Sequence, residues 1–182
     1  MIEQIKRCTN DPGNIILTRA EIAAKVEELA QRISEDYAGK TPVLECVLNG
    51  SFLFYADLVR ELSINSEVDF LKISSYANAL KSSGDVKIHK APDCDIRGRD
   101  VIVVEDIIDT GLSVFFLRKW LMEQSPKSLK FVSLLIKNDS AQVDYECEYY
   151  GFRIPNKFVI GYGLDYAQQF RALPDIYAVE TS

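Results

Sequence analysis

Histidine is almost absent from the sequence: the 182 residues include one, His89. It lies in a polar stretch, residues 86–90, whose alternating pattern indicates a surface strand. Histidine-based acid–base or triad chemistry is therefore nearly excluded. If the protein uses a general base, we expect that base to be a carboxylate.

Cysteine is scarce and scattered over the chain at Cys8, Cys46, Cys94 and Cys147, with no Cys-x-x-Cys pair. This spacing argues against a zinc site and against a disulfide framework. We therefore expect free thiols, as in proteins of a reducing compartment.

Long apolar runs are also missing, since none approaches the length of a membrane span. Residues 1–7 lack the apolar core of a signal peptide. We therefore expect a cytoplasmic protein with no membrane partner.

Basic residues are fewer than acidic ones, 21 against 27, which gives a net charge of −6. This balance disfavours a nucleic-acid partner and provides no long-range attraction for a polyanionic substrate. Any phosphate site must therefore be built locally. The length and the 47% apolar content suit one globular domain that spans residues 1–182.

Strand and helix patterns alternate along most of the chain. A capping box, Thr18 to Glu21, opens an amphipathic helix that runs to Tyr37. The later segments are predicted as a strand at 43–48, a helix at 52–62, strands at 67–74, 86–89 and 101–104, a helix that begins at 113 and ends near Pro126, and a strand at 129–136. This order predicts an α/β fold with a mostly parallel, twisted sheet flanked by helices. The N-terminal segment, the first helix and residues near 155–182 should form a small hood.

The most informative stretch is residues 101–113. An apolar, β-branched run ends in Glu105 and Asp106, and three residues later Asp109 begins a turn that leads through Ser113 into a helix. We expect the strand to end at the two acids and a loop to follow. The amides, hydroxyls and helix N-terminus of that loop favour a phosphate, which the two carboxylates would repel. A Mg²⁺ ion would resolve the conflict, because it takes oxygen ligands from carboxylates and phosphorylated substrates together.

Two other segments have both an ordinary and a functional interpretation. The Asn49-Gly50-Ser51 turn joins a strand to a helix, so it is either a plain connection or a second anion site. Residues 75–84, between two predicted strands, form either a long hairpin or a lid that closes over a site.

The sequence VVEDIIDTGLS at 103–113 resembles the signature of the type I phosphoribosyltransferases, which bind 5-phosphoribosyl-1-pyrophosphate (PRPP), and most closely their hypoxanthine or hypoxanthine-guanine branch. The resemblance extends from the turn at 48–50 to Arg171. It implies the type I fold and a role in purine salvage. The reaction would join the phosphoribosyl group of PRPP to hypoxanthine, and also guanine, with Mg²⁺, giving IMP or GMP and pyrophosphate. Family members are usually homodimers or homotetramers.

The resemblance also implies residue roles. Asp109 would accept the proton from N7 of the purine. The PRPP phosphate and ribose would be bound by Glu105, Asp106, Asp109, Thr110, Gly111, Leu112 and Ser113. The purine base would contact Ile107, Lys137, Phe158, Val159 and Asp165. Pyrophosphate would contact Asn49, Gly50, Ser75, Tyr76 and Arg171, with a cis peptide at the first turn. Mg²⁺ would be held near Glu105, Asp106 and Asp165.

Several of these assignments have alternatives. Lys137 taken alone could be a lysine at a strand end with its head in solvent, and Phe158 could be a core residue. Many family members have Lys-Gly where this chain has Asn49-Gly50, which leaves the charge at that turn open. The alternative functions are a phosphoribosyltransferase-fold regulator that binds nucleic acid, and a transferase for xanthine or a pyrimidine.

Overall fold

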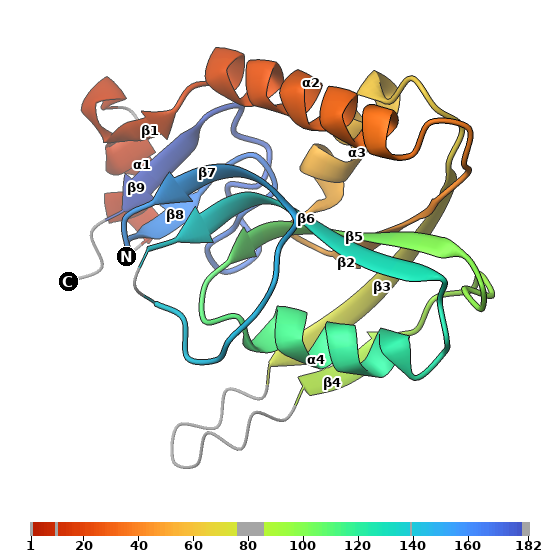
Figure 1. Ribbon diagram of the computed structural model, residues 1–182. Helices are drawn as coiled ribbons and strands as arrows, with labels where there is room; N and C mark the ends of the chain where they lie inside the picture. The colour runs from red at the N-terminus through yellow and green to blue at the C-terminus, as the bar shows by residue number, and fades with distance from the viewer. Residues whose placement is uncertain (1, 10, 76–85, 139, 180–182) are drawn as a thin grey trace.

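The computed structural model describes residues 2–9, 11–75, 86–138 and 140–179, and Figure 1 shows its layers. A six-stranded sheet forms the centre, with strand order β4-β3-β2-β5-β6-β7. Its strands are β2 (Val43–Leu48), β3 (Glu67–Ser75), β4 (Val86–Lys90), β5 (Asp100–Ile108), β6 (Ser128–Lys137) and β7 (Tyr149–Ile154). Neighbouring strands are parallel except β4, which runs antiparallel to β3. The predicted α/β class with a mostly parallel sheet is confirmed.

Helices cover both faces of this sheet. The helices α2 (Arg19–Asp36) and α3 (Phe52–Glu61) lie above it in Figure 1, and α4 (Leu112–Met122) lies below. Along β5, Ile102 and Val104 belong to the core under α2 and α3, whereas Val101 and Val103 belong to the core over α4. A strand buried on both faces reads as a continuous apolar run, because successive side chains point to opposite sides.

The helix at 19–36 begins with the predicted capping box, in which Thr18 and Glu21 bond reciprocally. Its place in the hood was predicted wrongly. Its buried face, which includes Ile22 and Leu29, packs into the core of the six-stranded sheet. The apolar stripe of this long helix is wide enough to cover the sheet, and that burial outweighs any contact with the chain ends.

A second, three-stranded sheet with order β1-β9-β8 lies beside the carboxyl ends of β5 and β6 (Figure 1). Its strands are β1 (Ile15–Leu17), β8 (Phe158–Ile160) and β9 (Ile176–Val179), and they pair antiparallel. The helix α1 (Ile2–Thr9) and a short 3₁₀ turn, η1 (Pro12–Asn14), precede them. We call this sheet with α1 the hood.

The central strand is longer than predicted. β5 continues past the two acids to Ile108, because Glu105, Ile107 and Ile108 pair with Ser133, Leu135 and Ile136 of β6. The prediction that the strand ends at the acidic pair was therefore wrong. The helix that follows starts at Leu112, after Gly111 in the left-handed region at φ 80°.

His89 lies exposed on β4, as predicted, and its ring nitrogen is 2.7 Å from the hydroxyl oxygen of Ser74. Tyr76 and nearly all of the 75–84 segment lie outside the described residues, and the hairpin and the lid both stay predictions. In the described part of the chain, no helix combines the length and apolar character needed to cross a membrane.

Candidate active site

The carboxyl ends of β2, β5 and β6 meet the hood around a cavity of about 300 Å³, which we call the hood pocket. In an open α/β sheet, ligands bind at this edge. The pocket is lined by Asn49, Gly50, Asp106, Ile107, Asp109, Lys137, Phe158, Val159, Leu164, Asp165 and Arg171. Every predicted purine or pyrophosphate contact that the structure describes is present, and Tyr76 and the side chain of Ser75 lie outside the described part of the chain. Leu164 is the one lining residue that the sequence did not indicate.

A second cavity of about 250 Å³, the Gly111 pocket, adjoins the first, since both are lined by Ile107 and Asp109. Its other lining residues are Glu105, Ile108, Thr110, Gly111, Ser113 and Val114. Leu112, predicted to contact phosphate, does not line it. Its backbone N–H instead donates to the hydroxyl of Thr110 at 3.5 Å.

The two acids that motivated the metal prediction line different pockets. Glu105 lines the Gly111 pocket and Asp106 lines the hood pocket, because consecutive residues of a continuing strand face opposite ways. Burial, and then the charge of Asp106, raise the pKa of Glu105. Burial raises the pKa of Asp106 to about 6, although the N–H of Ile107 donates to its Oδ1 at 2.8 Å. A nearby cation would favour the charged forms of both.

Asp109 is held at both its side chain and its backbone. The ammonium of Lys137 lies 2.7 Å from Oδ2 of Asp109, so the predicted base and the predicted O6 ligand contact one another. The hydroxyl of Ser140 donates to the Asp109 carbonyl at 2.8 Å, and the N–H of Gln142 donates to the Thr110 carbonyl at 2.9 Å. The β6–β7 connection therefore supports the loop that links β5 to α4.

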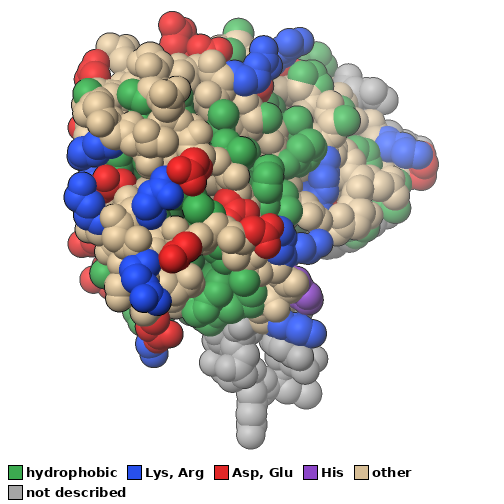
Figure 2. All heavy atoms as spheres, turned by 90° about the vertical axis from the view of Figure 1, so that its right-hand side faces the viewer, with side chains coloured by type: hydrophobic (Ala, Val, Ile, Leu, Met, Phe, Trp, Pro, Cys, Tyr) green, Lys and Arg blue, Asp and Glu red, His purple; other side chains and the backbone are tan. Residues whose placement is uncertain are grey.

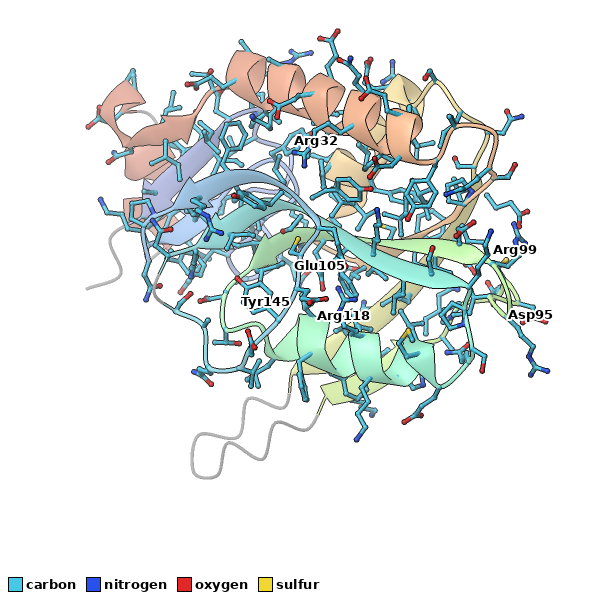
Figure 3. All side chains as sticks on the ribbon, in the orientation of Figure 1. Arg32, Asp95, Arg99, Glu105, Arg118 and Tyr145 are labelled. Atoms are coloured by element: carbon cyan, nitrogen blue, oxygen red, sulfur yellow. The ribbon has the colours of Figure 1, made fainter. Side chains whose placement is uncertain are left out.

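The same connection covers Gly111. A Cβ atom on Gly111 would overlap the ring of Tyr145, and the φ of 80° already favours glycine. Figure 3 shows Tyr145 and Glu105 in the layer between the sheet and α4. Nothing in the sequence points to Ser140, Gln142 or Tyr145, because they lie in an irregular segment with no periodic pattern and no motif.

The turn after β2 approaches the site through its backbone. The peptide between Leu48 and Asn49 is cis, as the resemblance implied. A Cβ atom on Gly50 would overlap the carboxylate of Asp106, and one on Gly163 would overlap the carbonyl of Gly50. Gly50 therefore packs against a side chain of β5, and Gly163 packs against the backbone of Gly50, so a Cβ atom at either glycine would force a neighbour to shift.

The last charged groups lie on the segment 161–173, which we call the hood loop. Nη2 of Arg171 is 2.7 Å from Oδ1 of Asp165, and Nη1 of Arg171 donates to the Gly163 carbonyl at 2.7 Å. The N–H of Gln168 donates to the other carboxylate oxygen of Asp165 at 2.8 Å. Asp165 and Arg171 thus form one fixed pair at the wall of the hood pocket.

The apolar wall of the pocket comes from β8. Phe158 is partly buried and packs edge-to-face on Tyr166, with ring centroids 5.9 Å apart. It therefore belongs to the hood core and also lines the pocket, and its stacking on a purine stays a prediction. Val159 is buried next to it.

The oxygen donors near the pockets suit a hard divalent cation, which prefers carboxylates, phosphates and water. Among the described residues, no three histidine, cysteine or acidic side chains converge as a metal-binding group. Asp106 and Asp165 both line the hood pocket, and one or two carboxylates together with substrate oxygens commonly hold Mg²⁺.

Comparisons with known proteins agree with this geometry. Residues 13–167 match the family described as phosphoribosyl transferase domain. The chain is 46% identical over 164 residues to a hypoxanthine phosphoribosyltransferase of Escherichia coli, which covers 89% of this chain and 92% of the relative. A hypoxanthine-guanine phosphoribosyltransferase of Streptococcus thermophilus is 42% identical over 164 residues, covering 90% of this chain and 91% of the relative.

Among solved structures, a hypoxanthine-guanine phosphoribosyltransferase of Bacillus anthracis with a HEPES molecule in its active site is similar, with a TM-score of 0.87 and 43% identity. The match covers 91% of this chain and 98% of that chain. The chain therefore belongs to the phosphoribosyltransferase family, in its hypoxanthine or hypoxanthine-guanine branch.

Proposed function

We propose that the protein is a purine-salvage enzyme that transfers the 5-phosphoribosyl group of PRPP to hypoxanthine, and also to guanine. The bond from the anomeric carbon to pyrophosphate breaks as N9 of the purine forms the new glycosidic bond, and IMP or GMP results. The observation that supports this most directly is the hood pocket, which places a carboxylate, a lysine and an aromatic ring around one cavity.

Asp109 and Lys137 suit the two polar edges of a 6-oxopurine. Asp109 would accept the proton that leaves N7, and the ammonium of Lys137 would donate to O6. The 2.7 Å contact between them fixes the position of the Lys137 ammonium at the wall of the pocket. Phe158 offers a ring face to the base and Val159 its backbone, and Ile107 lines the same pocket.

The Gly111 pocket would hold the 5-phosphate. Residues Thr110 and Ser113 supply hydroxyls, and the backbone at the start of α4 supplies N–H groups. The backbone N–H of Leu112 would join them by exchanging its 3.5 Å bond to the Thr110 hydroxyl for the phosphate. The bracing by Ser140 and Gln142 keeps this loop preformed, so that less ordering free energy is lost on binding.

Pyrophosphate would contact the Asn49-Gly50 turn and Arg171, together with Ser75 and Tyr76. Among the described residues, the hood pocket is lined by the three carboxylates of Asp106, Asp109 and Asp165 but by two cationic side chains, Lys137 and Arg171. A polyanion therefore needs additional positive charge there. We propose Mg²⁺ near Asp106 and Asp165, with Glu105 at the ribose side, where the ion would neutralise charge on the leaving group.

We further propose that the enzyme is cytoplasmic and assembles as a homodimer or homotetramer. Three of the described cysteines, Cys46, Cys94 and Cys147, are free thiols. Val68 and Phe70 of β3 are exposed large hydrophobic side chains, and on the face in Figure 2 hydrophobic groups lie among interspersed acidic and basic ones. Such a surface suits protein contact better than nucleic acid. Light scattering coupled to size exclusion should give a dimer or tetramer mass, and a monomer at all concentrations would contradict this assembly.

The function is tested by a panel of bases. Purified protein is incubated with PRPP, Mg²⁺ and hypoxanthine, guanine, xanthine or adenine, and nucleotide and pyrophosphate are quantified. We expect equimolar IMP and pyrophosphate with hypoxanthine, product with guanine, and loss of turnover when EDTA removes the metal. Failure to convert any 6-oxopurine would contradict the proposal, and turnover of xanthine alone would reassign the substrate.

A further inference from the structure

Tyr162 lies outside both pockets but has an unusual conformation. It is a bulky residue in the left-handed region at φ 48°, it is 8% exposed, and its hydroxyl donates to Oδ2 of Asp57 at 2.7 Å. A non-glycine residue in this region is strained, and it persists where surrounding contacts hold it. Burial and the Asp57 carboxylate raise the pKa of Tyr162, so its hydroxyl remains a donor near neutral pH.

On one side, backbone hydrogen bonds connect Tyr162 to the hood loop, which carries Asp165 and Arg171, the pair at the wall of the hood pocket. The N–H of Tyr162 donates to the Leu173 carbonyl at 2.8 Å, and the N–H of Gly163 donates to the Arg171 carbonyl at 2.9 Å. The side chain of Arg171 returns to the Gly163 carbonyl at 2.7 Å. These bonds join the two ends of the hood loop next to Tyr162, and Asp165 and Arg171 lie on the loop that they close.

On the other side, Asp57 belongs to α3, the helix that starts directly after the Asn49-Gly50-Ser51 turn. Gly163 approaches the carbonyl of Gly50 so closely that a Cβ atom would overlap it. The Tyr162–Asp57 hydrogen bond thus connects the helix that extends from the turn with the loop that presents Arg171. Residues 57 and 162 are brought together although 105 positions separate them.

We propose that Tyr162 and Asp57 are positioning residues for PRPP and pyrophosphate: their hydrogen bond holds the hood loop against α3, so that Arg171 and the Asn49-Gly50 turn face one ligand. This inference depends on the proposed roles of Arg171 and the turn. Neither positioning residue touches the purine side of the pocket, so the effect should be confined to the phosphate-bearing substrate.

The test is steady-state kinetics of Tyr162→Phe with PRPP and hypoxanthine varied separately. Loss of a hydrogen bond to a charged acceptor should raise the KM for PRPP, and the inhibition constant of pyrophosphate, by about tenfold. The KM for hypoxanthine and kcat should change little. The matched control is Tyr55→Phe. Tyr55 is a buried residue of α3, and its hydroxyl donates to the Leu44 carbonyl at 2.9 Å, so this variant also removes one tyrosine hydrogen bond.

Substitutions of Asp57 separate positioning from simple loss of stability. Asp57→Asn keeps an acceptor oxygen and should retain a KM for PRPP near that of the wild type. Asp57→Ala should behave like Tyr162→Phe, and the double variant should be no worse than either single one, as expected for two ends of one interaction. These Asp57 variants also give the answer if Tyr162→Phe folds poorly.

The inference is overturned if Tyr162→Phe and Tyr55→Phe have the same KM for PRPP, or if both substrates are affected equally. It is also overturned if Asp57→Asn is as impaired as Asp57→Ala. Arg171→Ala separates failure of the positioning inference from failure of the proposed role of Arg171. If Arg171→Ala weakens PRPP binding while Tyr162→Phe does not, only the positioning inference fails. If Arg171→Ala leaves PRPP binding intact, the proposed role of Arg171 fails as well.

Discussion

The ammonium of Lys137 lies 2.7 Å from Oδ2 of Asp109, so the two polar groups proposed to bind the purine are bonded to each other. Asp109 lies after β5 and Lys137 is the last residue of β6, and the parallel pairing of these strands brings them to one edge of the sheet. Under the proposed roles, a bound 6-oxopurine would replace this contact with one from N7 to Asp109 and one from O6 to Lys137.

Replacing Lys137 with glutamine should therefore weaken base recognition. We expect the KM for hypoxanthine to rise by about tenfold, because a charge-assisted donor to O6 is lost. The KM for PRPP should change little. Lys130→Gln is the matched control, since Lys130 belongs to the same strand but pairs with Asp36 at 3.2 Å. An unchanged KM for hypoxanthine in Lys137→Gln would remove Lys137 from the base site.

Gly50→Ala should impair PRPP binding for a steric reason. The new methyl group would overlap the Asp106 carboxylate, so the turn or the acid must shift. Isothermal calorimetry with PRPP and Mg²⁺ should show a clear loss of affinity. Gly98→Ala is the control, because Gly98 has a positive φ of 68° but open space around it, so it tests backbone strain alone. Equal PRPP affinity in Gly50→Ala and the wild type would contradict the close packing at this turn.

Asn49→Lys should tighten PRPP binding, because it adds a third cationic side chain to a pocket lined by three carboxylates. We expect a lower KM for PRPP and half-maximal activity at a lower Mg²⁺ concentration, with both effects shrinking at high salt. Asn49→Gln extends the side chain without charge and serves as control. If the lysine and glutamine variants respond alike to salt, charge at this position is irrelevant.

Glu45→Gln should stabilise the protein at neutral and alkaline pH. Glu45 is fully buried on β2, and its two carboxylate oxygens have no hydrogen-bond partner among the described residues. Burial, with repulsion from Asp69 and Asp93 that outweighs attraction by Lys90, raises its pKa from 4.5 to about 8. Between these values the folded protein retains a proton that the unfolded chain has lost, so unfolding free energy falls as pH rises and levels off above 8.

Urea unfolding from pH 5 to 9 measures this effect. The wild type should lose stability relative to Glu45→Gln by up to about 1.4 kcal/mol per pH unit below pH 8. Glu67→Gln is the control, because the Arg99 guanidinium, with Nη2 2.6 Å from Oε1 of Glu67, lowers the pKa of Glu67. Arg99 lies at the end of the sheet far from the hood (Figure 3). Because Glu67→Gln keeps Glu45, its stability profile should run parallel to that of the wild type in this range. Parallel pH profiles for the wild type and Glu45→Gln would contradict an unpaired buried carboxyl.

The sequence allowed the strand and helix order, the capping box at Thr18 and most of the hood-pocket residues to be predicted. Those features depend on local periodicity and on a motif whose residues are adjacent in the chain. The extension of β5 through Glu105 and Asp106 was missed, because two acids look like the end of a strand until their pairing with β6 is known. The pattern alone could not show that they line different pockets.

The supporting contacts could not be predicted for a different reason. Ser140 and Tyr145 belong to an irregular connection, and only the folded structure brings them against Asp109 and Gly111. Tyr162 and Asp57 look in sequence like an ordinary core aromatic and a surface acid. Their role depends on a tertiary contact between a loop and a helix, which no local pattern encodes.

The central claim is that Asp109 is the general base for a purine bound against Lys137, and Asp109→Asn tests it most directly. Steady-state kinetics with PRPP, Mg²⁺ and hypoxanthine should show kcat lowered by roughly 10²–10⁴-fold, the range of general-base contributions, with little change in the KM for PRPP. A kcat equal to that of the wild type would contradict the account.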